Sequence, residues 1–212
     1  MTKEVKIILI ISVVIIAGVF WLAVKSTNQQ AVPVSSSLLV KDNSHMTGQK
    51  NAKVTVVEFG DYQCPACGYA EPIVEQVLAD YKSNPDFNFV FRNFPLPMHA
   101  NAQAAALAAE TAVAQGKFWE MHNKIYQAQA QWSDLSDPTD TFAGYAQELG
   151  LDVNKFKDSL KKKEFSSAVS DDLSDGQTLG INATPTFYIN GIKFETVLSL
   201  DKFKAEIDKR LK

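Results

Sequence analysis

Cys64 and Cys67 are the only cysteines in this 212-residue chain, and they stand three positions apart in Cys64-Pro65-Ala66-Cys67. Residues 54–59, just before them, are rich in β-branched side chains, and the residues after them favour a helix. A strand would therefore deliver Cys64 to a helix N-terminus, where unpaired N–H groups and the helix dipole stabilise a thiolate. The spacing predicts thiol–disulfide exchange, with Cys64 as the nucleophile and Cys67 as the resolving thiol.

Two other uses of the cysteine pair are less consistent with the sequence. A structural zinc ion takes four protein ligands, whereas one C-x-x-C supplies two, and the histidines at 45, 99 and 122 have no paired-ligand spacing. A static disulfide around so small a loop constrains the unfolded chain little, so it is a poor crosslink. We therefore expect redox chemistry at the pair, with no metal and no cofactor.

Glu58 is the second candidate, because strand alternation places it on the same face as Val54 and Val56. A carboxyl group on a core-facing side is costly unless it is paired or used. Buried near the two thiols, Glu58 would have a raised pKa and would relay protons during exchange. The alternative is an edge position, from which the carboxylate reaches solvent.

Thr184 and Pro185 directly precede the β-rich residues 186–189. Proline cannot donate to a sheet ladder and belongs at the first residue or edge of a strand. If the Thr184–Pro185 bond were cis, it would leave neighbouring backbone free to pair with an extended peptide. His99 follows a proline-rich loop and either lines the active-site surface or serves as a loop or capping residue.

The elements that position these residues alternate between strands and helices. The pattern predicts a strand at 54–59, a helix at 64–81 kinked by Pro72, a strand at 87–94, helices within 98–180, strands at 186–189 and 192–195, and a helix at 200–211. A crossover makes the first two strands parallel, and the tight Asn190-Gly191 turn makes the last two antiparallel. We expect an α/β layer architecture that includes a helical subdomain.

Residues 7–24 form an apolar stretch close to the length of a membrane-spanning helix. The stretch ends at Trp21 and Lys25 rather than in small residues typical of signal-peptide cleavage, which favours a retained transmembrane anchor over a cleaved signal peptide. Residues 1–6 would then stay in the cytoplasm, and the domain would face an oxidising compartment.

The expected domain boundaries follow from composition. The polar, turn-rich residues 25–50 indicate a flexible linker, and the folded domain should comprise residues 51–212. A formal net charge of −3 gives no argument for nucleic-acid binding.

Several segments together resemble the DsbA-like thiol:disulfide oxidoreductases, in the membrane-anchored branch of the thioredoxin superfamily. The resemblance runs from about residue 51 to the C-terminus, and it is carried by Pro72 and by residues 57–67 (VEFGDYQCPAC), 91–96 (FRNFPL), 116–122 (GKFWEMH) and 180–187 (GINATPTF). It implies a thioredoxin fold with a helical insertion at about 98–180.

The resemblance also implies roles for individual residues. Cys64 and Cys67 would form the redox-active disulfide, with Cys64 as the exposed nucleophile. Glu58 would be the buried acid, and Pro185 the cis-proline facing the dithiol. Thr184, Pro65 and Ala66 would contact the substrate.

The implied enzyme is tethered to the cell membrane, introduces disulfides into folding exported proteins, and is reoxidised by a membrane partner of the DsbB or VKOR type. Strongly oxidising members of the family carry histidine at the position of Ala66, and Thr184 is shared with reducing and isomerising relatives. A reductase or isomerase, and a peptide-binding module without redox turnover, therefore stay open as alternatives.

Overall fold

The computed structural model describes residues 15, 16, 18, 33–194 and 198–212, and the chain divides into two units, Met1–Val32 and Pro33–Lys212. The second unit holds both cysteines. The expected anchor at 7–24, apart from residues 15, 16 and 18, and the expected linker up to residue 32 lie outside the described residues. Among the residues that are described, no helix has the length and apolar character needed to cross a membrane.

A five-stranded mixed sheet forms the centre of the second unit, with the strand order β1-β3-β2-β4-β5. The strands are β1 (His45–Met46), β2 (Val54–Gly60), β3 (Phe87–Asn93), β4 (Thr186–Ile189) and β5 (Ile192–Lys193). β2 and β3 are parallel, and β4 pairs antiparallel with both β2 and β5. The predicted pairing of the first two and the last two strands is confirmed.

The turn between β4 and β5 has the backbone that its sequence predicts. Asn190 and Gly191 both have positive φ, 49° and 81°, as a tight two-residue hairpin turn of right-handed twist requires. β5 ends at Lys193, and Glu195, expected at the end of this strand, lies outside the described residues.

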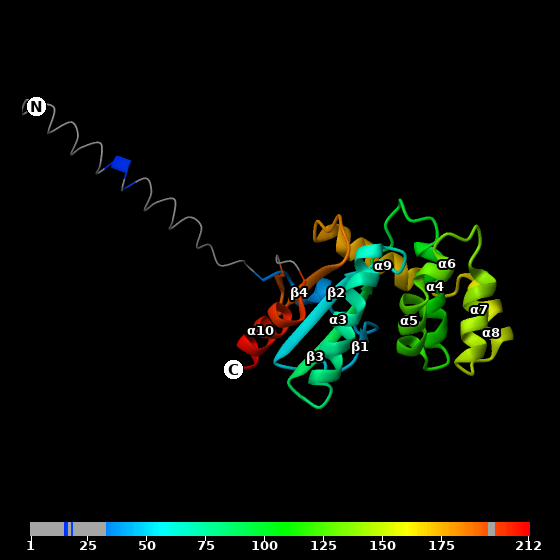
Figure 1. Cartoon of the computed structure of the whole chain (residues 1–212), viewed down its shortest axis with the longest axis horizontal. Coiled ribbons are helices and arrows are strands. Elements are labelled where there is room, and N and C mark those ends of the chain that lie inside the picture. Colours follow the sequence, from blue (N-terminus) through cyan, green and yellow to red (C-terminus); the bar gives the residue numbers. More distant parts are fainter. Residues whose placement is uncertain (1–14, 17, 19–32, 195–197) are drawn as a thin grey trace, which may run out of the picture. The chain divides into compact units, whose positions relative to one another are not determined.

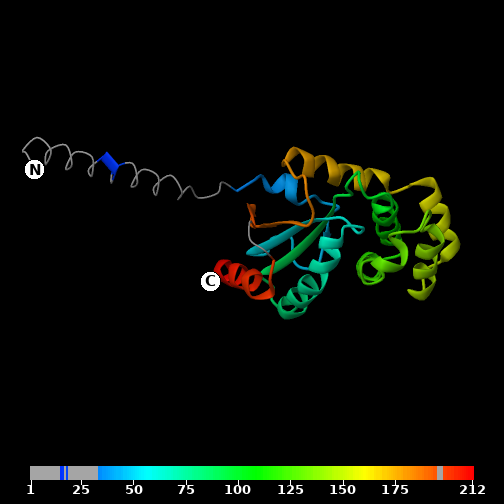
Figure 2. The same ribbon diagram turned by 45° about the horizontal axis from the view of Figure 1, so that its top comes forward.

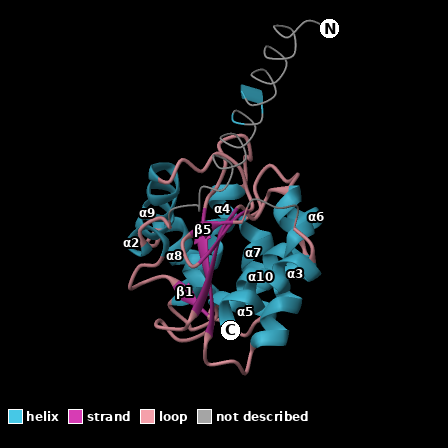
Figure 3. Cartoon of the chain, turned by 90° about the vertical axis from the view of Figure 1, so that its left-hand side faces the viewer, coloured by secondary structure: helices cyan, strands magenta, loops and turns pink. Residues whose placement is uncertain are grey.

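Helices cover both faces of the sheet (Figure 3). They are α2 (Ser36–Leu39), α3 (Pro65–Tyr81), α4 (Ala102–Val113), α5 (Phe118–Gln127), α6 (Gln129–Trp132), α7 (Thr139–Glu148), α8 (Val153–Lys162), α9 (Ser166–Thr178) and α10 (Leu200–Leu211). α3 and α10 pack together on one face, whereas α2 and α9 pack together on the other. Each face buries its own apolar cluster, because successive side chains of β2 and β3 point to opposite sides.

Helices α4 to α8 gather beyond one end of the sheet, and α9 returns from them to β3 (Figures 1 and 2). The alanine-rich α4 contacts α5, α7, α8 and α9, and its small side chains allow these close packings. The fold is therefore a mixed α/β thioredoxin-like arrangement with a helical insertion, as predicted from the sequence.

The expected flexible linker is wrong for residues 33–50, which belong to the folded unit. This segment contains α2 and β1, and β1 pairs with the edge of β3. The N–H of Val34 donates to the carbonyl of Gly191 at 3.0 Å, and Leu39 is buried. The polar composition of the segment suggested a linker, but composition cannot show partners that lie far along the chain. One such partner is Arg92, whose guanidinium donates to the carbonyls of Leu38 and Leu39.

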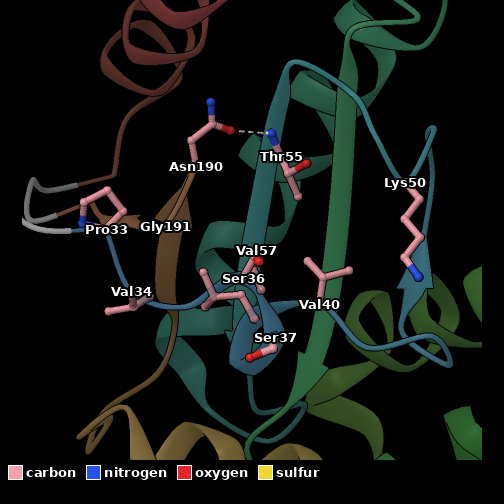
Figure 4. A pocket seen from close by; sticks show the side chains of 11 residues that line it. Pro33, Val34, Ser36, Ser37, Val40, Lys50, Thr55, Val57, Asn190 and Gly191 are labelled. Carbon is pink, nitrogen blue, oxygen red and sulfur yellow. Dashed lines mark hydrogen bonds between the residues drawn. The ribbon is translucent and has the colours of Figure 1, made fainter.

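Figure 4 shows this segment passing β4 and β2, with Pro33 and Val34 beside Gly191. The side chains there line a pocket of about 540 Å³. In the same view the Asn190 amide oxygen accepts the backbone N–H of Thr55 at 2.8 Å. None of the residues that line this pocket is a predicted site residue.

Candidate active site

Cys64 is the N-cap of α3, and the strand that delivers it is β2. Pro65 occupies the first turn of the helix, where no intrahelical donor is needed, and both Pro65 and Ala66 are exposed. Cys67 lies one turn further in and is only 1% exposed, compared with 7% for Cys64. In this structure neither cysteine is in a disulfide.

Several donors lower the pKa of the Cys64 thiol to about 5. The largest effect is a hydrogen bond from the Cys67 side chain, which outweighs the opposing effect of burial. Thr184 and the backbone N–H groups of Cys67 and Ala66 lower the pKa further. Cys64 is therefore a thiolate at neutral pH.

Cys67 has the opposite electrostatic environment. Burial raises its pKa well above the ordinary value, and the hydrogen bond to Cys64 and the charge of Glu58 add to that effect. The N–H of Asp61 points at the Cys67 sulfur at 3.5 Å. The pair thus combines a stabilised thiolate near the surface with a buried thiol that keeps its proton.

Glu58 lies on the central strand and is 1% exposed, so the alternative of an edge carboxylate in solvent is wrong. Its neighbours across the sheet are Phe91 on β3 and Phe187 on β4. Burial raises the pKa of Glu58 well above its ordinary value, and the negative charge of Glu71 raises it further. This environment therefore favours the neutral, protonated form of the carboxyl group.

The residues just before β4 lie beside the N-terminus of α3, next to the two cysteines. The Thr184–Pro185 peptide bond is cis, and the Sγ atom of Cys64 lies 3.4 Å from the Thr184 carbonyl oxygen. The Thr184 hydroxyl is buried without a hydrogen-bond partner among the described residues. The structure thereby brings together around the motif the predicted site residues Cys64, Cys67, Glu58, Thr184 and Pro185.

Asp61, which the sequence suggested only as a strand terminator, organises the loop before the motif. Its carboxylate accepts the N–H groups of Gln63 and Leu96, both at 2.8 Å. The same carboxylate lies 2.6 Å from Nδ1 of His99, so His99 fastens its own loop to the site. The contact agrees with the loop-residue interpretation of His99, and it also places the ring beside the residue whose N–H points at the Cys67 sulfur.

Sequence reasoning missed Gln129, which the helical insertion contributes to the site. Its side-chain amide donates to the carbonyls of Tyr62 and Cys64 at 2.7 and 2.9 Å. A Cβ atom at Gly68 would lie 2.5 Å from the Gln129 side chain, so glycine permits this approach. Gln129 lies 65 residues from Cys64, and no local pattern marks it.

In the part of the chain that the structure describes, no three His, Cys, Asp or Glu side chains are grouped so that they could hold a metal ion. Among the described residues, the site combines two thiols, the buried carboxyl groups of Glu58 and Asp61, the Thr184 hydroxyl and backbone donors. This arrangement can stabilise one thiolate, supply or accept one proton, and exchange a disulfide.

Comparisons with known proteins agree with this arrangement. Residues 41–209 match the sequence model of the thioredoxin family. The chain is 32% identical to disulfide bond formation protein D of Bacillus subtilis over 174 residues, which covers 78% of this chain and 76% of that protein. The crystal structure of oxidised BdbD from Bacillus subtilis superposes with a TM-score of 0.73 at 28% identity, covering 85% of this chain and 97% of that one.

A second kind of relative contains a similar segment within a longer protein. The chain is 36% identical over 169 residues to Na(+)/H(+) antiporter NhaA 1 of Salinispora arenicola, which is 78% of this chain. It spans 24%, about a quarter, of the length of that antiporter. Because the family's sequence model covers most of the chain and disulfide bond formation protein D matches over three quarters of its own length, the chain belongs to the thioredoxin family.

Proposed function

We propose that this chain is a thiol:disulfide oxidoreductase that introduces disulfide bonds into exported proteins through Cys64 and Cys67. The observation that carries the proposal is the environment of Cys64, whose pKa is about 5. A thiolate that is stable at neutral pH stabilises the reduced pair, and a stable reduced pair makes the corresponding disulfide a strong oxidant. The similarity to disulfide bond formation protein D supports the same direction.

The reaction moves two electrons from a substrate dithiol to the enzyme. A substrate thiolate attacks Sγ of Cys64, the Cys64–Cys67 bond breaks, and Cys67 leaves with the bonding electron pair. Glu58 gives its proton to Cys67. The second substrate thiolate then attacks the substrate sulfur of the mixed disulfide and releases Cys64, which its surrounding donors stabilise as a thiolate.

The exposed part of the motif is the proposed contact with the substrate. Pro65 and Ala66 are open to solvent, and Thr184, which lies just before β4, has its carbonyl oxygen 3.4 Å from the Cys64 sulfur. Next to the motif in sequence, Tyr69 is 81% exposed. An exposed apolar surface of this kind can contact unfolded substrate chains of many different sequences.

The proposed location is the outer side of the cell membrane, with residues 7–24 as the anchor. The apolar character of this stretch supports the anchor, and oxidative folding requires an oxidising compartment. The reduced enzyme would pass its electrons to a membrane reoxidase of the DsbB or VKOR type. Its substrates would be exported proteins that still carry reduced cysteines.

A measurement of the reduction potential tests the direction of electron flow. The purified protein is equilibrated in glutathione buffers, and the reduced fraction is read by alkylation and mass spectrometry. We expect a potential between about −120 and −180 mV, the range of DsbA and protein disulfide isomerase. A potential near about −270 mV, as in thioredoxin, would instead identify the reductase that Ala66 and Thr184 leave open.

Trapping tests whether the chain performs exchange at all. The Cys67→Ala variant should accumulate a mixed disulfide between Cys64 and a cysteine-containing peptide, because the resolving thiol is missing. The matched Cys64→Ala variant should form none. If neither variant forms an adduct, the exchange function fails, and the alternative of a peptide-binding module without redox turnover is favoured.

A further inference from the structure

The backbone around Cys64 is held by a donor from outside α3. The Cys64 carbonyl oxygen accepts the N–H of Gly68 at 3.1 Å, which is the first hydrogen bond of the helix. The side-chain amide of Gln129 is a second donor to the same oxygen at 2.9 Å, and it also donates to the Tyr62 carbonyl at 2.7 Å. One amide nitrogen therefore bridges the backbone before and after the Cys64 Cα atom.

Gln129 is held in place even though α6 is only 4 residues long. Trp132, at the other end of α6, is completely buried and donates its indole N–H to the Ile125 carbonyl of α5 at 2.8 Å. The side-chain amide of Gln63, in the loop before α3, donates to the Ser133 carbonyl at 2.7 Å. Because α6 is tied to α5 on one side and to this loop on the other, it carries the Gln129 amide to a fixed position.

The glycine at position 68 gives the Gln129 side chain its place beside the first turn of α3. A Cβ atom at Gly68 would lie 2.5 Å from Oε1 and 3.1 Å from Nε2 of Gln129, so a larger residue would push the amide away from the two carbonyls. Gly68 lies within α3 and has no positive φ that would require glycine. The approach of Gln129 therefore explains a glycine at a helical position where alanine would favour the helix more.

The direction of the Cys64 carbonyl matters for the thiol because of the bonds that join them. Rotation about ψ of Cys64, which is 122°, turns the carbonyl and moves the start of α3 relative to the sulfur. The next dihedral, φ of Pro65, is fixed by the proline ring, and the residues after it have helical backbone angles. A fixed carbonyl therefore fixes where the N–H groups of Ala66 and Cys67 lie, and these groups help to lower the pKa of Cys64.

We propose that Gln129 is a positioning residue through which the helical insertion directs the N–H groups of the first turn of α3 at the Cys64 sulfur. The inference rests on the proposed exchange function, in which Cys64 is released as a thiolate. Without the amide, the Tyr62 carbonyl would bond to water, which imposes no fixed direction, and ψ of Cys64 would vary over a wider range. The insertion thus contributes to the reactivity of the thiol through an uncharged side chain.

The titration of Cys64 measures how well its donors are aligned. In the reduced protein, thiolate absorbance in the far ultraviolet is followed against pH, starting from a midpoint of about 5. In Gln129→Ala we expect the midpoint to rise by about half a pH unit or more, because hydrogen bonds to the thiolate weaken when their donors are misaligned. At neutral pH, the equilibrium constant for reduction of the Cys64–Cys67 disulfide by glutathione should then fall about threefold.

Gly68→Ala tests the same contact without removing Gln129. The added methyl group should displace the amide and raise the midpoint, although alanine favours the helix. In the Gln129→Ala background, Gly68→Ala should leave the midpoint unchanged, because no amide remains to be displaced. The control is Gln127→Ala, which removes an exposed amide that donates to Glu75 at 3.1 Å, and it should not move the midpoint. None of these substitutions changes the net charge, so a moved midpoint reports the geometry of the donors.

An unchanged midpoint in Gln129→Ala would overturn the proposal, and so would an equal displacement in Gln127→Ala. A displacement by Gly68→Ala that persists in full in the Gln129→Ala background would also contradict it, because position 68 would then act through the helix alone. If Gln129→Ala did not fold, an unchanged midpoint in Gly68→Ala would decide against the proposal. The titration needs no substrate, so its result is separate from the exchange function, which fails if Cys64 forms no mixed disulfide with a cysteine-containing peptide.

Discussion

The Sγ atom of Cys64 lies 3.4 Å from the carbonyl oxygen of Thr184, although 120 residues separate the two in the chain. The buried Thr184 hydroxyl has no hydrogen-bond partner among the described residues while Cys64 is a thiol. When the thiolate forms, that hydroxyl can donate to it, and Thr184 lowers the pKa of Cys64. The reactivity of Cys64 therefore depends on the start of β4 as well as on the start of α3.

Thr184→Val should raise the pKa of Cys64 by about one pH unit, because a hydrogen bond to a charged group contributes about 1.5–3 kcal/mol and one pKa unit corresponds to about 1.4 kcal/mol. The measurement is thiolate absorbance in the far ultraviolet against pH, starting from a midpoint of about 5. Thr186→Val is the matched control, since the Thr186 hydroxyl donates to the Ala183 carbonyl instead. A control that moves the midpoint as much as Thr184→Val would contradict a specific hydrogen bond.

Cys67→Ala should raise the pKa of Cys64 more than Thr184→Val does. The hydrogen bond from Cys67 is the largest of the effects that lower this pKa, and alanine removes the donor. Alkylation by iodoacetamide measures the change, because its rate follows the thiolate fraction. The unmodified protein should approach its maximal rate about one pH unit above its Cys64 pKa of about 5, and the variant only at higher pH. Equal rates for both proteins at the pKa of the unmodified protein would refute the assignment.

Local patterns in the sequence predict the elements that carry the dithiol. Strand alternation predicted the buried face of Glu58, and the Asn190-Gly191 pair predicted the hairpin, because both signals depend on residues a few positions apart. The predicted start of α3 rests on Pro65 in its first turn and Cys64 at its N-cap, which are also signals within a single turn of the chain. These predictions hold because the backbone geometry they need is local.

The parts that the sequence did not predict depend on partners far along the chain. Gln129 reaches the Cys64 carbonyl from the insertion, and His122 reaches Glu71 from α5. Residues 33–50 have a linker-like composition, yet they fold because Arg92 and Gly191 offer hydrogen-bonding groups to them. No periodicity within a segment can report a partner that only the tertiary fold brings close.

Glu58→Gln should raise the free energy of unfolding at about pH 7 but not at about pH 4. The pKa of Glu58 is higher in the folded protein than its ordinary value of 4.5, so folding favours the protonated form. That contribution is complete below the ordinary value and is lost as the pH rises through the folded pKa. Glutamine does not ionise, so the variant avoids this loss, which is about 1.4 kcal/mol for every pKa unit that separates the folded from the unfolded protein.

Urea unfolding at the two pH values measures the effect, with Glu75→Gln as the control for a carboxylate near the surface. The gain in Glu58→Gln should come with slower resolution of the mixed disulfide, because the proton acceptor is gone. A variant that is less stable than the unmodified protein at neutral pH would show that Glu58 is ionised and paired in the fold.

Arg92→Gln should destabilise the fold by about 3–5 kcal/mol, the cost of leaving buried charges without their partner. The Arg92 side chain is 1% exposed, and it pairs with Asp172 and Asp175 on α9. It also donates to the carbonyls of Leu38 and Leu39, so it joins the N-terminal segment, β3 and the last helix of the insertion. Urea unfolding monitored by circular dichroism gives the change in stability.

Lys41→Gln is the matched control, because Lys41 pairs with the same Asp175 at 3.1 Å but has a side chain that is 40% exposed. A solvent-exposed ion pair contributes less than about 1 kcal/mol, so this variant should unfold almost like the unmodified protein. Proteolysis adds a local readout: cleavage between residues 33 and 50 should accelerate in Arg92→Gln, because the segment loses the guanidinium that binds its carbonyls. If both variants lost the same stability, the stabilisation would come from net charge near α9, and burial of Arg92 would not explain why residues 33–50 are folded.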